Sequence, residues 1–370
     1  MLVLVVGGAG FIGSHTAEAL LKEGYRVRIL DNLDPKIHPA GKPSHIPDEV
    51  HFIEGDVRDR TAWENALEDV SCVYHFAAYQ DYLPDFSKFY HVNAAGTALL
   101  YEIIVEQNLP VQKVIVASSQ AVYGEGKYEC PEHGIVYPGN RSAASLRNSI
   151  WDHECPECRR ILVSQPTDEG RTNPANSYAI SKYTQETLSL KLGKQYDIPT
   201  TTLRYSIVQG PRQSFYNAYS GLCRVFCLSA FFDEKAIIFE DGNQLRDYVN
   251  IGDVVRANLL VLKDDRSNYE TYNVGGGRAL TVLEFLSTVE KVTEKRLDIE
   301  SGGHFRSGDT RHIVSDISKI GALGFSPEHT PDKSVLDYLS WLDETGGESG
   351  ILTEAYSRMK QSQIVCPIGT

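Results

Sequence analysis

The sequence predicts an α/β fold built on a doubly wound parallel sheet, and three observations support this prediction. The chain begins with an unbroken apolar run at residues 2–6, as a strand buried on both faces requires. Strand-like and helix-like segments then alternate as far as about residue 206. Beyond that point shorter elements are separated by loops that contain Gly and Asn, which predicts a second, smaller domain of mixed α/β type.

The elements of the first half follow one another in a regular order. Each expected strand is a short, largely apolar run, and a connecting segment with a helix pattern separates most of them. The expected strands cover residues 2–6, 25–30, 50–53, 70–76, 113–117 and 200–205. The expected helices begin after the glycine-rich turn that follows residue 6, at about residue 61, at about residue 90 and just before Tyr178. This repeat is typical of parallel β-α-β units.

The glycine-rich turn after the first strand has the form of a dinucleotide fingerprint. The segment Gly7-Gly8-Ala9-Gly10-Phe11-Ile12-Gly13 links the strand to a helix start. Its glycines permit a tight turn, a close approach of the backbone to a pyrophosphate and close packing of helix on strand. The turn therefore predicts a Rossmann-type domain. The candidate cofactor-binding residues within it are Gly7, Gly10, Phe11, Ile12 and Gly13.

An acidic residue follows the second expected strand. Asp31 stands at about the ~20-residue offset at which a carboxylate accepts a hydrogen bond from a ribose hydroxyl, and Asn32 follows it. A carboxylate at that place repels the additional phosphate of NADP. We therefore expect the cofactor to be NAD.

A tyrosine, a lysine and a serine form the candidate catalytic group. Tyr178 and Lys182 are four residues apart, so on a helix they share one face, and the lysine charge can lower the pKa of the phenol. Ser119 lies two residues after the apolar run at residues 113–117. A Tyr-x-x-x-Lys pair alone is common on solvated helices, but the dinucleotide fingerprint favours a catalytic role.

Composition restricts the classes of ligand. The 370 residues carry a net charge of -13, which argues against binding to nucleic acid or to an anionic membrane. No apolar stretch reaches the ~18 residues of a membrane span, and Met1 leads directly into the first strand, so we expect a cytoplasmic protein. The seven cysteines then read as thiols or metal ligands.

These motifs together resemble the extended short-chain dehydrogenase/reductase family, which includes sugar-nucleotide epimerases and dehydratases, over roughly residues 1–340. Leu245-Arg246-Asp247-Tyr248-Val249 and Arg306-Ser307-Gly308-Asp309 also match segments of that family. The resemblance implies cofactor contacts by Asp56, Val57, Ala77, Ala78, Asn93, Tyr178 and Lys182. It implies substrate contacts by Tyr79, Ser119, Gln120, Asn217, Arg246 and Arg306, the two arginines acting on the phosphates of a nucleotide sugar.

The residues after Ser119 distinguish between reactions of the family. In its 4,6-dehydratases and sugar-acid decarboxylases, acidic residues follow the catalytic Ser or Thr, whereas this chain has Gln120 and Ala121. An amide and a methyl group cannot act as general acid or base at neutral pH. The resemblance then implies an NAD-dependent 4-epimerase. A reductase, a 3,5-epimerase, a dehydratase and a catalytically silent NAD-sensing protein remain as alternatives.

Two segments depart from the family pattern. Ile207 stands where many relatives have an asparagine that contacts substrate, which puts the orientation of the sugar in question. The segment Tyr79-Gln80-Asp81-Tyr82 occupies the loop that shapes the sugar pocket, and it indicates no particular sugar.

A third departure is an insertion that contains two short metal-ligand motifs. Cys130-Pro-Glu-His133 and Cys155-Pro-Glu-Cys158 supply four soft donors, the set of a closed tetrahedral zinc site. Few apolar residues lie between them, so the insertion needs an additional cross-link, such as a bound metal ion, to fold. We expect structural zinc, with reduced surface thiols as the alternative. Such insertions resemble those of dTDP-L-rhamnose 4-epimerase-like members, which points to a deoxysugar nucleotide.

The domain boundaries follow from these assignments. We expect an NAD-binding domain at residues 1–206, with an insertion at 125–172 and a return segment near 247–273. Residues 207–246 and 274–342 should form the substrate-binding domain, and residues 343–370 a C-terminal tail, loosely ordered over about its last twenty residues. The helices at 93–107 and 177–196 resemble those that pair in relatives, which predicts a homodimer with a four-helix interface.

Overall fold

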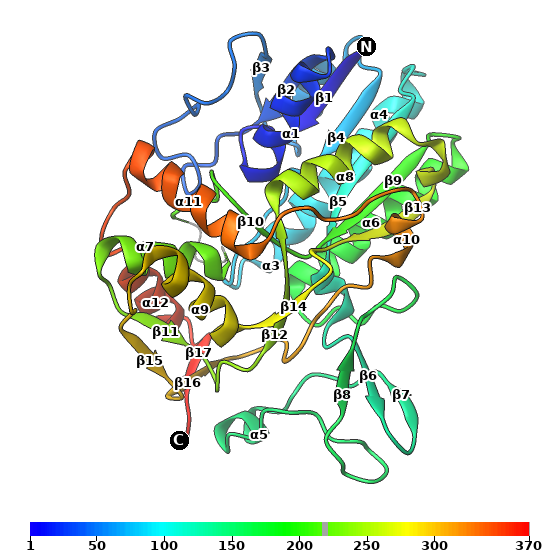
Figure 1. Cartoon of the computed structure of the whole chain (residues 1–370). Coiled ribbons are helices and arrows are strands. Elements are labelled where there is room, and N and C mark those ends of the chain that lie inside the picture. The colour runs from blue at the N-terminus through cyan, green and yellow to red at the C-terminus, as the bar shows by residue number, and fades with distance from the viewer. Residues whose placement is uncertain (217–220, 370) are drawn as a thin grey trace.

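A seven-stranded parallel sheet forms the centre of the molecule (Figure 1). The computed structural model describes residues 1–216 and 221–369. In spatial order the sheet contains β13 (Glu270–Val274), β9 (Thr200–Tyr205), β5 (Lys113–Ser119), β4 (Cys72–His75), β1 (Leu2–Val6), β2 (Arg26–Asp31) and β3 (His51–Glu54). The strand order reverses direction at β1, so the doubly wound parallel sheet predicted from the sequence is confirmed.

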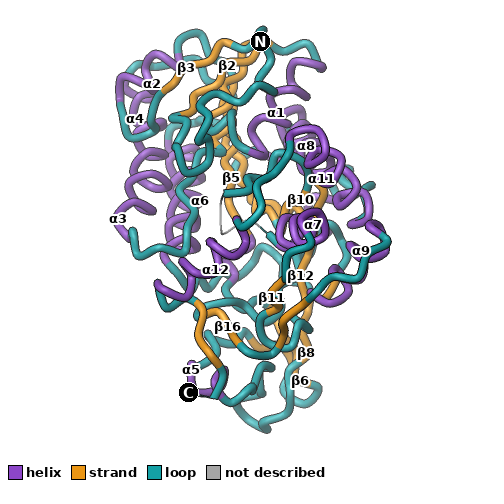
Figure 2. Tube along the Cα trace, turned by 90° about the vertical axis from the view of Figure 1, so that its left-hand side faces the viewer, coloured by secondary structure: helices purple, strands orange, loops and turns teal. Residues whose placement is uncertain are grey.

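Helices cover both faces of this sheet because both faces of its strands are apolar. Val3 and Val5 pack toward a layer formed by α1 (Phe11–Lys22) and α8 (Ile251–Lys263). Leu2, Leu4 and Val6 alternate with them and pack toward the opposite layer. That layer contains α2 (Arg60–Leu67), α4 (Gly96–Glu106) and α6 (Ser177–Gln195). In Figure 2 the two helix layers lie on opposite sides of the strands.

The helix expected from about residue 90 is composite. A short helix α3 (Phe86–Phe89) continues into the π-helical turn η1 (Tyr90–Ala95) and then into α4. Asn93 lies within the π-helical turn and is fully buried. Such turns often occur at functional sites.

The second half of the chain builds a smaller domain with its own core. Cys223 and Cys227 are part of that core, as apolar residues of a helix. Its sheet contains β10 (Ile207–Gln209), β12 (Leu245–Asn250) and β14 (Ala279–Thr281), and β11 (Ala236–Ile238) pairs with β15 (Ile299–Ser301). Its helices are α7 (Leu222–Phe232), α9 (Val282–Thr293) and α11 (Pro331–Thr345). In the expected return segment, β13 joins the central sheet and α8 packs against it. β12 belongs instead to the sheet of the smaller domain.

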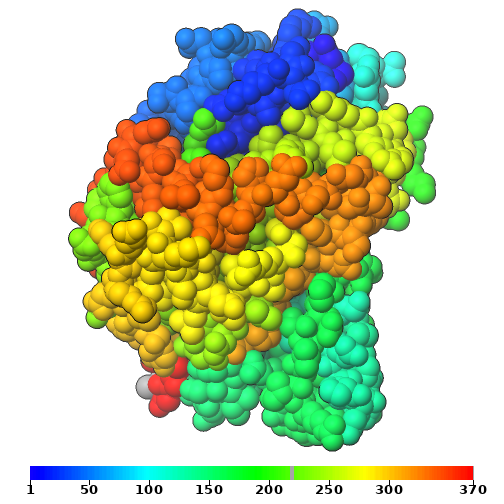
Figure 3. Space-filling view, viewed as in Figure 1, coloured from blue at the N-terminus to red at the C-terminus, as the bar shows by residue number. Residues whose placement is uncertain are grey.

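The insertion projects from the body of the molecule. It contains a three-stranded antiparallel sheet in the order β7 (Gly134–Val136), β6 (Lys127–Cys130) and β8 (Val163–Gln165), and a short helix α5 (Ala143–Arg147) lies between β7 and β8 in the chain. In Figure 3 it forms the green and teal lobe below the rest of the chain. Its buried apolar cluster is small: Tyr128, Cys130, Cys155 and Leu162.

The expectation of a loosely ordered C-terminal end is wrong. Residues near the terminus form α12 (Ile351–Gln361) and β17 (Val365–Pro367), and β17 pairs antiparallel with β16 (His304–Arg306). Ile351 and Ala355 are four residues apart and both are buried, so α12 has an apolar face that packs on the smaller domain. Within the described part of the chain, no helix is long and apolar enough to cross a membrane.

Candidate active site

One large cavity runs between the two domains at the carboxyl ends of the parallel strands. Its volume is about 1510 Å³. It extends from the glycine-rich turn, past Ser119 and Tyr178, to Arg246 and Arg306. Open α/β sheets bind ligands at this edge, where the strand order reverses.

The glycine-rich turn forms one end of the cavity, and two of its glycines are required by close packing. Gly7 has φ +76°, and a Cβ there would lie 2.6 Å from the backbone nitrogen of Ala77. A Cβ on Gly13 would lie 2.2 Å from the carbonyl oxygen of Gly7. Gly13 therefore packs the helix on the turn, while Gly7, Gly10, Phe11 and Ile12 line the cavity.

Asp31 stands beside this turn at the end of β2. Its carboxylate accepts hydrogen bonds from the backbone N–H groups of Ala9 at 2.9 Å and Leu33 at 3.0 Å. Burial raises the pKa of Asp31, and these two hydrogen bonds oppose the rise. Asp31 thus both shapes the turn and presents a carboxylate to the cavity.

The remaining expected cofactor residues extend the same wall. Asn32 donates a hydrogen bond to Asp56 at 3.0 Å. Hydrogen bonds from Arg58 to the Asp56 carboxylate lower its pKa to about 2, so it is charged at neutral pH. Asn32, Asp56, Val57, Ala77 and Ala78 all line the cavity.

Asn93 has a different role from the one expected. Its Oδ1 accepts from the backbone N–H of Tyr79 at 2.7 Å, and its Nδ2 donates to the Tyr79 carbonyl and to Ser181 Oγ. It is fully buried and is not part of the cavity wall. Asn93 braces the Tyr79 loop against α6.

Ser119 and Tyr178 lie next to each other on the cavity wall because β5 and α6 pack together there. Ser119 is the last residue of β5, and its Oγ accepts from the N–H of Ala121 at 3.1 Å. Asn176 caps α6, its Oδ1 accepting from the N–H of Ala179 at 2.9 Å. Burial raises the pKa of Tyr178 to about 12, and a hydrogen bond with Ser119 opposes the rise.

Lys182 lies on the same helix face as Tyr178, as expected, but its effect on the phenol differs from the expectation. Its ammonium donates to Gln185 Oε1, and burial lowers the pKa of Lys182 to about 7. Burial dominates the pKa of Tyr178 and raises it, and Lys182 is not among the groups that oppose this rise in this structure. Gln185 in turn donates to Thr97 Oγ1 at 2.8 Å, which contacts His75 Nε2 at 2.9 Å. This buried chain of polar groups behind Lys182 was not predicted from the sequence, because its members come from separate segments.

The cavity beside Tyr178 is partly apolar. Tyr79, Phe89 and Tyr178 form a small cluster against which Ala121 packs. Tyr79 Oη donates to Asp85 at 2.6 Å. Tyr79 and Gln120, both expected to contact substrate, line this part of the cavity.

Arginines form the end of the cavity in the smaller domain. Arg246 donates to the carbonyls of Thr310 and Arg311 at 2.8 and 2.9 Å and lies 3.6 Å from Asp309. Arg306 pairs with Asp309 at 2.6 Å and donates to Tyr82 Oη at 2.7 Å. A further arginine of this wall, Arg224, was not predicted from the sequence. It lies on α7 among apolar residues. Asn217, the remaining expected substrate residue, lies outside the described residues.

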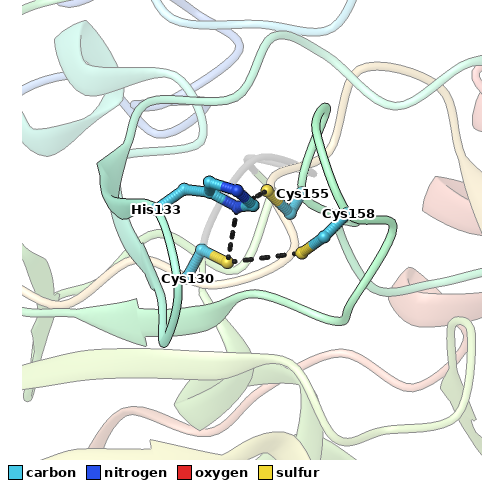
Figure 4. A group of neighbouring side chains, drawn as sticks. All are labelled: Cys130, His133, Cys155 and Cys158. Carbon is cyan, nitrogen blue, oxygen red and sulfur yellow. Dashed lines mark hydrogen bonds between the residues drawn. The ribbon is translucent and has the colours of Figure 1, made fainter.

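The four expected metal ligands converge in the insertion (Figure 4). The ligand atoms of Cys130, His133, Cys155 and Cys158 all lie within 4.8 Å of one another. His133 Nδ1 is 3.5 Å from Cys130 Sγ and 3.4 Å from Cys155 Sγ, and the Sγ atoms of Cys130 and Cys158 are 3.6 Å apart. Three thiols and one imidazole, supplied by two separate turns of the chain, match the donor set of a structural zinc site. Among the described residues this is the one such cluster.

Comparison with known proteins agrees with this geometry. The family model "NAD dependent epimerase/dehydratase family" matches residues 3–142 and 152–275. The chain is 31% identical over 349 residues to a dTDP-L-rhamnose 4-epimerase of Burkholderia thailandensis, covering 92% of this chain and 94% of that protein. It is 30% identical over 347 residues to a putative UDP-glucose 4-epimerase of Methanocaldococcus jannaschii, covering 92% and 98%.

Solved structures give the same assignment. A UDP-glucose 4-epimerase of Thermotoga maritima, solved with UDP-glucose, matches with a TM-score of 0.75 and 28% identity, covering 93% of this chain and 99% of that one. A UDP-glucuronic acid 4-epimerase of Bacillus cereus, in complex with UDP-glucuronic acid and NAD, matches with a TM-score of 0.74 and 26% identity, covering 93% and 99%. The sequence match and the shared architecture establish that this chain belongs to the NAD-dependent epimerase/dehydratase family.

Proposed function

We propose that this protein is an NAD-dependent nucleotide-sugar 4-epimerase that acts by transient oxidation at sugar C4. One observation carries the proposal. Ser119 and Tyr178 face a single cavity that has a dinucleotide turn at one end and arginines at the other. A nucleotide sugar bound by its phosphates at the arginine end can place its sugar beside the serine and the tyrosine.

The residues present suit NAD. The backbone at Gly7 and Gly10 leaves room for a pyrophosphate, and Asp31 offers a carboxylate for ribose hydroxyls. The same carboxylate disfavours the additional phosphate of NADP. Bound NAD supplies the acceptor, and later the donor, of the C4 hydride.

The side chains supply proton transfer and orientation. Tyr178 takes the O4 proton as C4 is oxidised and returns it when the 4-keto sugar, presenting its other face, is reduced. Ser119 hydrogen-bonds the reacting oxygen. Because burial keeps the Tyr178 pKa near 12, the phenol needs a nearby positive charge in order to act at neutral pH. Lys182, with a pKa of about 7, can provide that charge when protonated.

The site supports simple epimerisation over other chemistry of the family. Gln120 and Ala121 line the cavity where a dehydratase needs acidic groups. Tyr79 and Ala121, members of the apolar cluster beside Tyr178, line the cavity and suit a sugar with an apolar group. We therefore favour a dTDP- or UDP-linked sugar, and a deoxysugar in particular, as in the Burkholderia relative.

The experiment is a product analysis. The purified protein is incubated in D₂O with dTDP- and UDP-linked sugars, and the products are identified by NMR. Inversion at C4 without deuterium uptake is expected. Net consumption of added NADH would indicate a reductase, deuterium at C3 or C5 a 3,5-epimerase, and loss of water a dehydratase. No conversion of any sugar would overturn the proposal.

Tyr178→Phe tests the proposed mechanism. The variant should lose at least about 10²-fold in turnover, because it keeps the ring but lacks the proton carrier, and it should retain bound NAD. Tyr196→Phe, at the exposed end of the same helix, is the control and should keep wild-type turnover. Near-full activity of Tyr178→Phe would contradict the mechanism.

We also propose that the insertion holds a structural zinc ion on Cys130, His133, Cys155 and Cys158. The convergence of four soft donors over a very small apolar core supports it. The site belongs to an insertion, whereas Ser119 and Tyr178 lie on elements of the central domain, so the metal has no place in the proton transfer.

A homodimer through α4 and α6 is a further part of the proposal. These helices pack side by side, Val105 and Ile180 are exposed on them, 37% and 39% respectively, and Phe86 on α3 is also exposed. Apolar side chains on an unpaired helix layer favour association with a second copy. Light scattering at micromolar concentration tests it, and a monomeric mass would contradict it.

A further inference from the structure

Arg224 is a buried arginine that has no carboxylate partner. It lies in the first turn of α7, its side chain is part of the cavity wall, and the residue is 2% exposed. Its Nη1 donates to the carbonyl of Phe215 at 2.6 Å. Its Nε is buried and has no hydrogen-bond partner in the part of the chain that the structure describes.

This arrangement is costly unless something else contacts the guanidinium. An unpaired buried charge destabilises a protein by several kcal/mol, about 3–5 kcal/mol where one partner of a buried pair is removed. Two comparably buried arginines of this chain avoid that cost: Arg204 pairs with Glu186, and Arg311 pairs with Asp241. Among the described residues, no carboxylate lies within ion-pair distance of Arg224. Burial accordingly lowers the pKa of Arg224.

Arg224 belongs to a group of three arginines that gather around one phenol. Burial raises the pKa of Tyr82, while the nearby charges of Arg306, Arg246 and Arg224 lower it. These arginines come from three different elements, β16, β12 and α7, and all three line the cavity.

The charges of this group do not balance within the protein. Arg246 and Arg306 share a single carboxylate, Asp309, at 3.6 and 2.6 Å. Arg224 adds a positive charge and no further acid. Arg224 therefore contributes a positive charge that no carboxylate of the described residues balances, and a phosphate group of a ligand can balance it.

We propose that Arg224 binds the diphosphate of the nucleotide sugar directly, as a third guanidinium beside Arg246 and Arg306. The inference rests on the proposed function in taking a nucleotide sugar as the ligand. A planar guanidinium with unused donors suits phosphate oxygens, and charge-assisted hydrogen bonds to phosphate are strong in a site from which water is excluded. The nucleotide sugar then neutralises a charge that the fold leaves unpaired.

Arg224→Met tests this assignment, with UDP and dTDP as probes in calorimetric titrations. Methionine fills a similar volume without charge. The variant should bind whichever nucleoside diphosphate the wild type binds about ten- to a hundredfold more weakly, the effect of losing one or two charge-assisted hydrogen bonds. Its content of NAD should not change. Arg256→Met is the control, because Arg256 is half-exposed outside the cavity and pairs with Asp253, and its affinity should be that of the wild type.

Thermal unfolding separates ligand binding from a structural role. If Arg224 serves the ligand, the ligand-free methionine variant should unfold at the same or a higher temperature than the wild type. Inorganic pyrophosphate should then raise the unfolding temperature of the wild type more than that of the variant. Unchanged diphosphate affinity in Arg224→Met, or an equal response to pyrophosphate, would overturn the assignment. Wild-type protein that binds neither UDP nor dTDP would instead overturn the proposed function, and this assignment with it.

Discussion

Two groups of buried arginines lie close together in this molecule and differ in their supply of carboxylates. The paired cluster contains Arg141, Arg311, Glu125, Glu240 and Asp241. Arg141 donates to both oxygens of Glu240 at 2.8 Å, and Arg311 donates to Asp241 at 2.6 and 2.9 Å. Glu125 accepts from the backbone N–H of Arg311 at 2.8 Å. Here acids outnumber arginines, and no ligand is needed to balance the charge.

The pocket cluster contains Arg224, Arg246, Arg306 and Asp309, and its balance is reversed. Arg246 and Arg306 pair with its one acid, Arg224 has no carboxylate partner among the described residues, and all three arginines line the cavity. The two clusters are linked, since Arg141 also donates to the carbonyl of Asp309 at 2.9 Å. The comparison teaches that buried arginines alone do not mark a ligand site. The deficit of carboxylates around them does, because a folded protein cannot retain an unpaired buried charge without cost.

The largest expected effect follows from loss of the zinc site that stabilises the insertion. Arg141 of the paired cluster belongs to this insertion. Replacing Cys155 and Cys158 together with serine should lower the zinc content from about one equivalent per chain to near zero. Because the insertion has little apolar core, it should then lose its order, and proteolysis within residues 125–172 should become much faster. Elemental analysis and limited proteolysis measure both effects.

The metal experiment has a simple control. Cys366→Ser, a cysteine outside the four-residue cluster, should leave zinc content and proteolysis unchanged. The double variant should still catalyse the same type of reaction. Wild-type protein with less than about a tenth of an equivalent of zinc would refute the site.

The next effect concerns a carboxylate of the paired cluster. Glu240 is 1% exposed and accepts hydrogen bonds from both Arg141 and Arg311. Glu240→Gln removes the negative charge beside these two buried guanidiniums. The free energy of unfolding should therefore fall by about 3 kcal/mol in urea denaturation. Arg224→Met should show no such fall, although it also removes a buried group.

Burial, and not the number of acids, should decide these outcomes. Arg60 contacts Glu64, Glu102 and Glu106, but all four side chains are exposed on the surface. Arg60→Met should therefore leave the urea midpoint within experimental error. A loss of unfolding free energy in Arg60→Met as large as that in Glu240→Gln would contradict this dependence on burial.

The smallest effect is a pH dependence from Lys182, a buried cation whose ammonium donates to the neutral Gln185. Burial lowers its pKa to about 7, whereas an unfolded chain keeps lysine protonated to about pH 10.4. Between these values the unfolded state binds more protons, so this group makes stability rise with pH, by at most about 1.4 kcal/mol per unit. Lys182→Met should be more stable than the wild type at pH 7.

The advantage of Lys182→Met over the wild type should shrink as the pH is raised from 7 to 9. Urea midpoints of the cofactor-stripped proteins at pH 7, 8 and 9 measure it. Lys113→Met is the control for loss of another buried lysine. Parallel stability curves for wild type and Lys182→Met would show that the Lys182 ammonium is charged throughout this range.

Most of the central domain could be predicted from the sequence, because its signals are local. The apolar run Leu2–Val6, the glycine turn after it and Asp31 at the end of the next strand each specify their own geometry. The spacing of Tyr178 and Lys182 likewise places them on one helix face. The two Cys motifs predicted the convergence of four ligands because metal-ligand spacing within each motif is short-range.

Other features could not be predicted, because they depend on contacts between distant segments. The apolar face of α12 is short, and its order depends on packing against the smaller domain and on the pairing of β17 with β16. Asn93 appears in the sequence as one more polar residue on a helix, yet its partners are Tyr79 and Ser181. The pKa of Tyr178 depends on burial, which no spacing in the sequence reports.

The sequence by itself determined the parallel sheet, the dinucleotide turn, the Ser119, Tyr178 and Lys182 group and the convergence of three cysteines and one histidine. Each of these is encoded in a short window, where backbone geometry follows directly from residue type. Only the tertiary structure decided which arginines are paired. Arg224 lies in an apolar helix pattern and reads as an ordinary helical residue, because the absence of a carboxylate beside it is a property of the space around it and not of its neighbours in the chain.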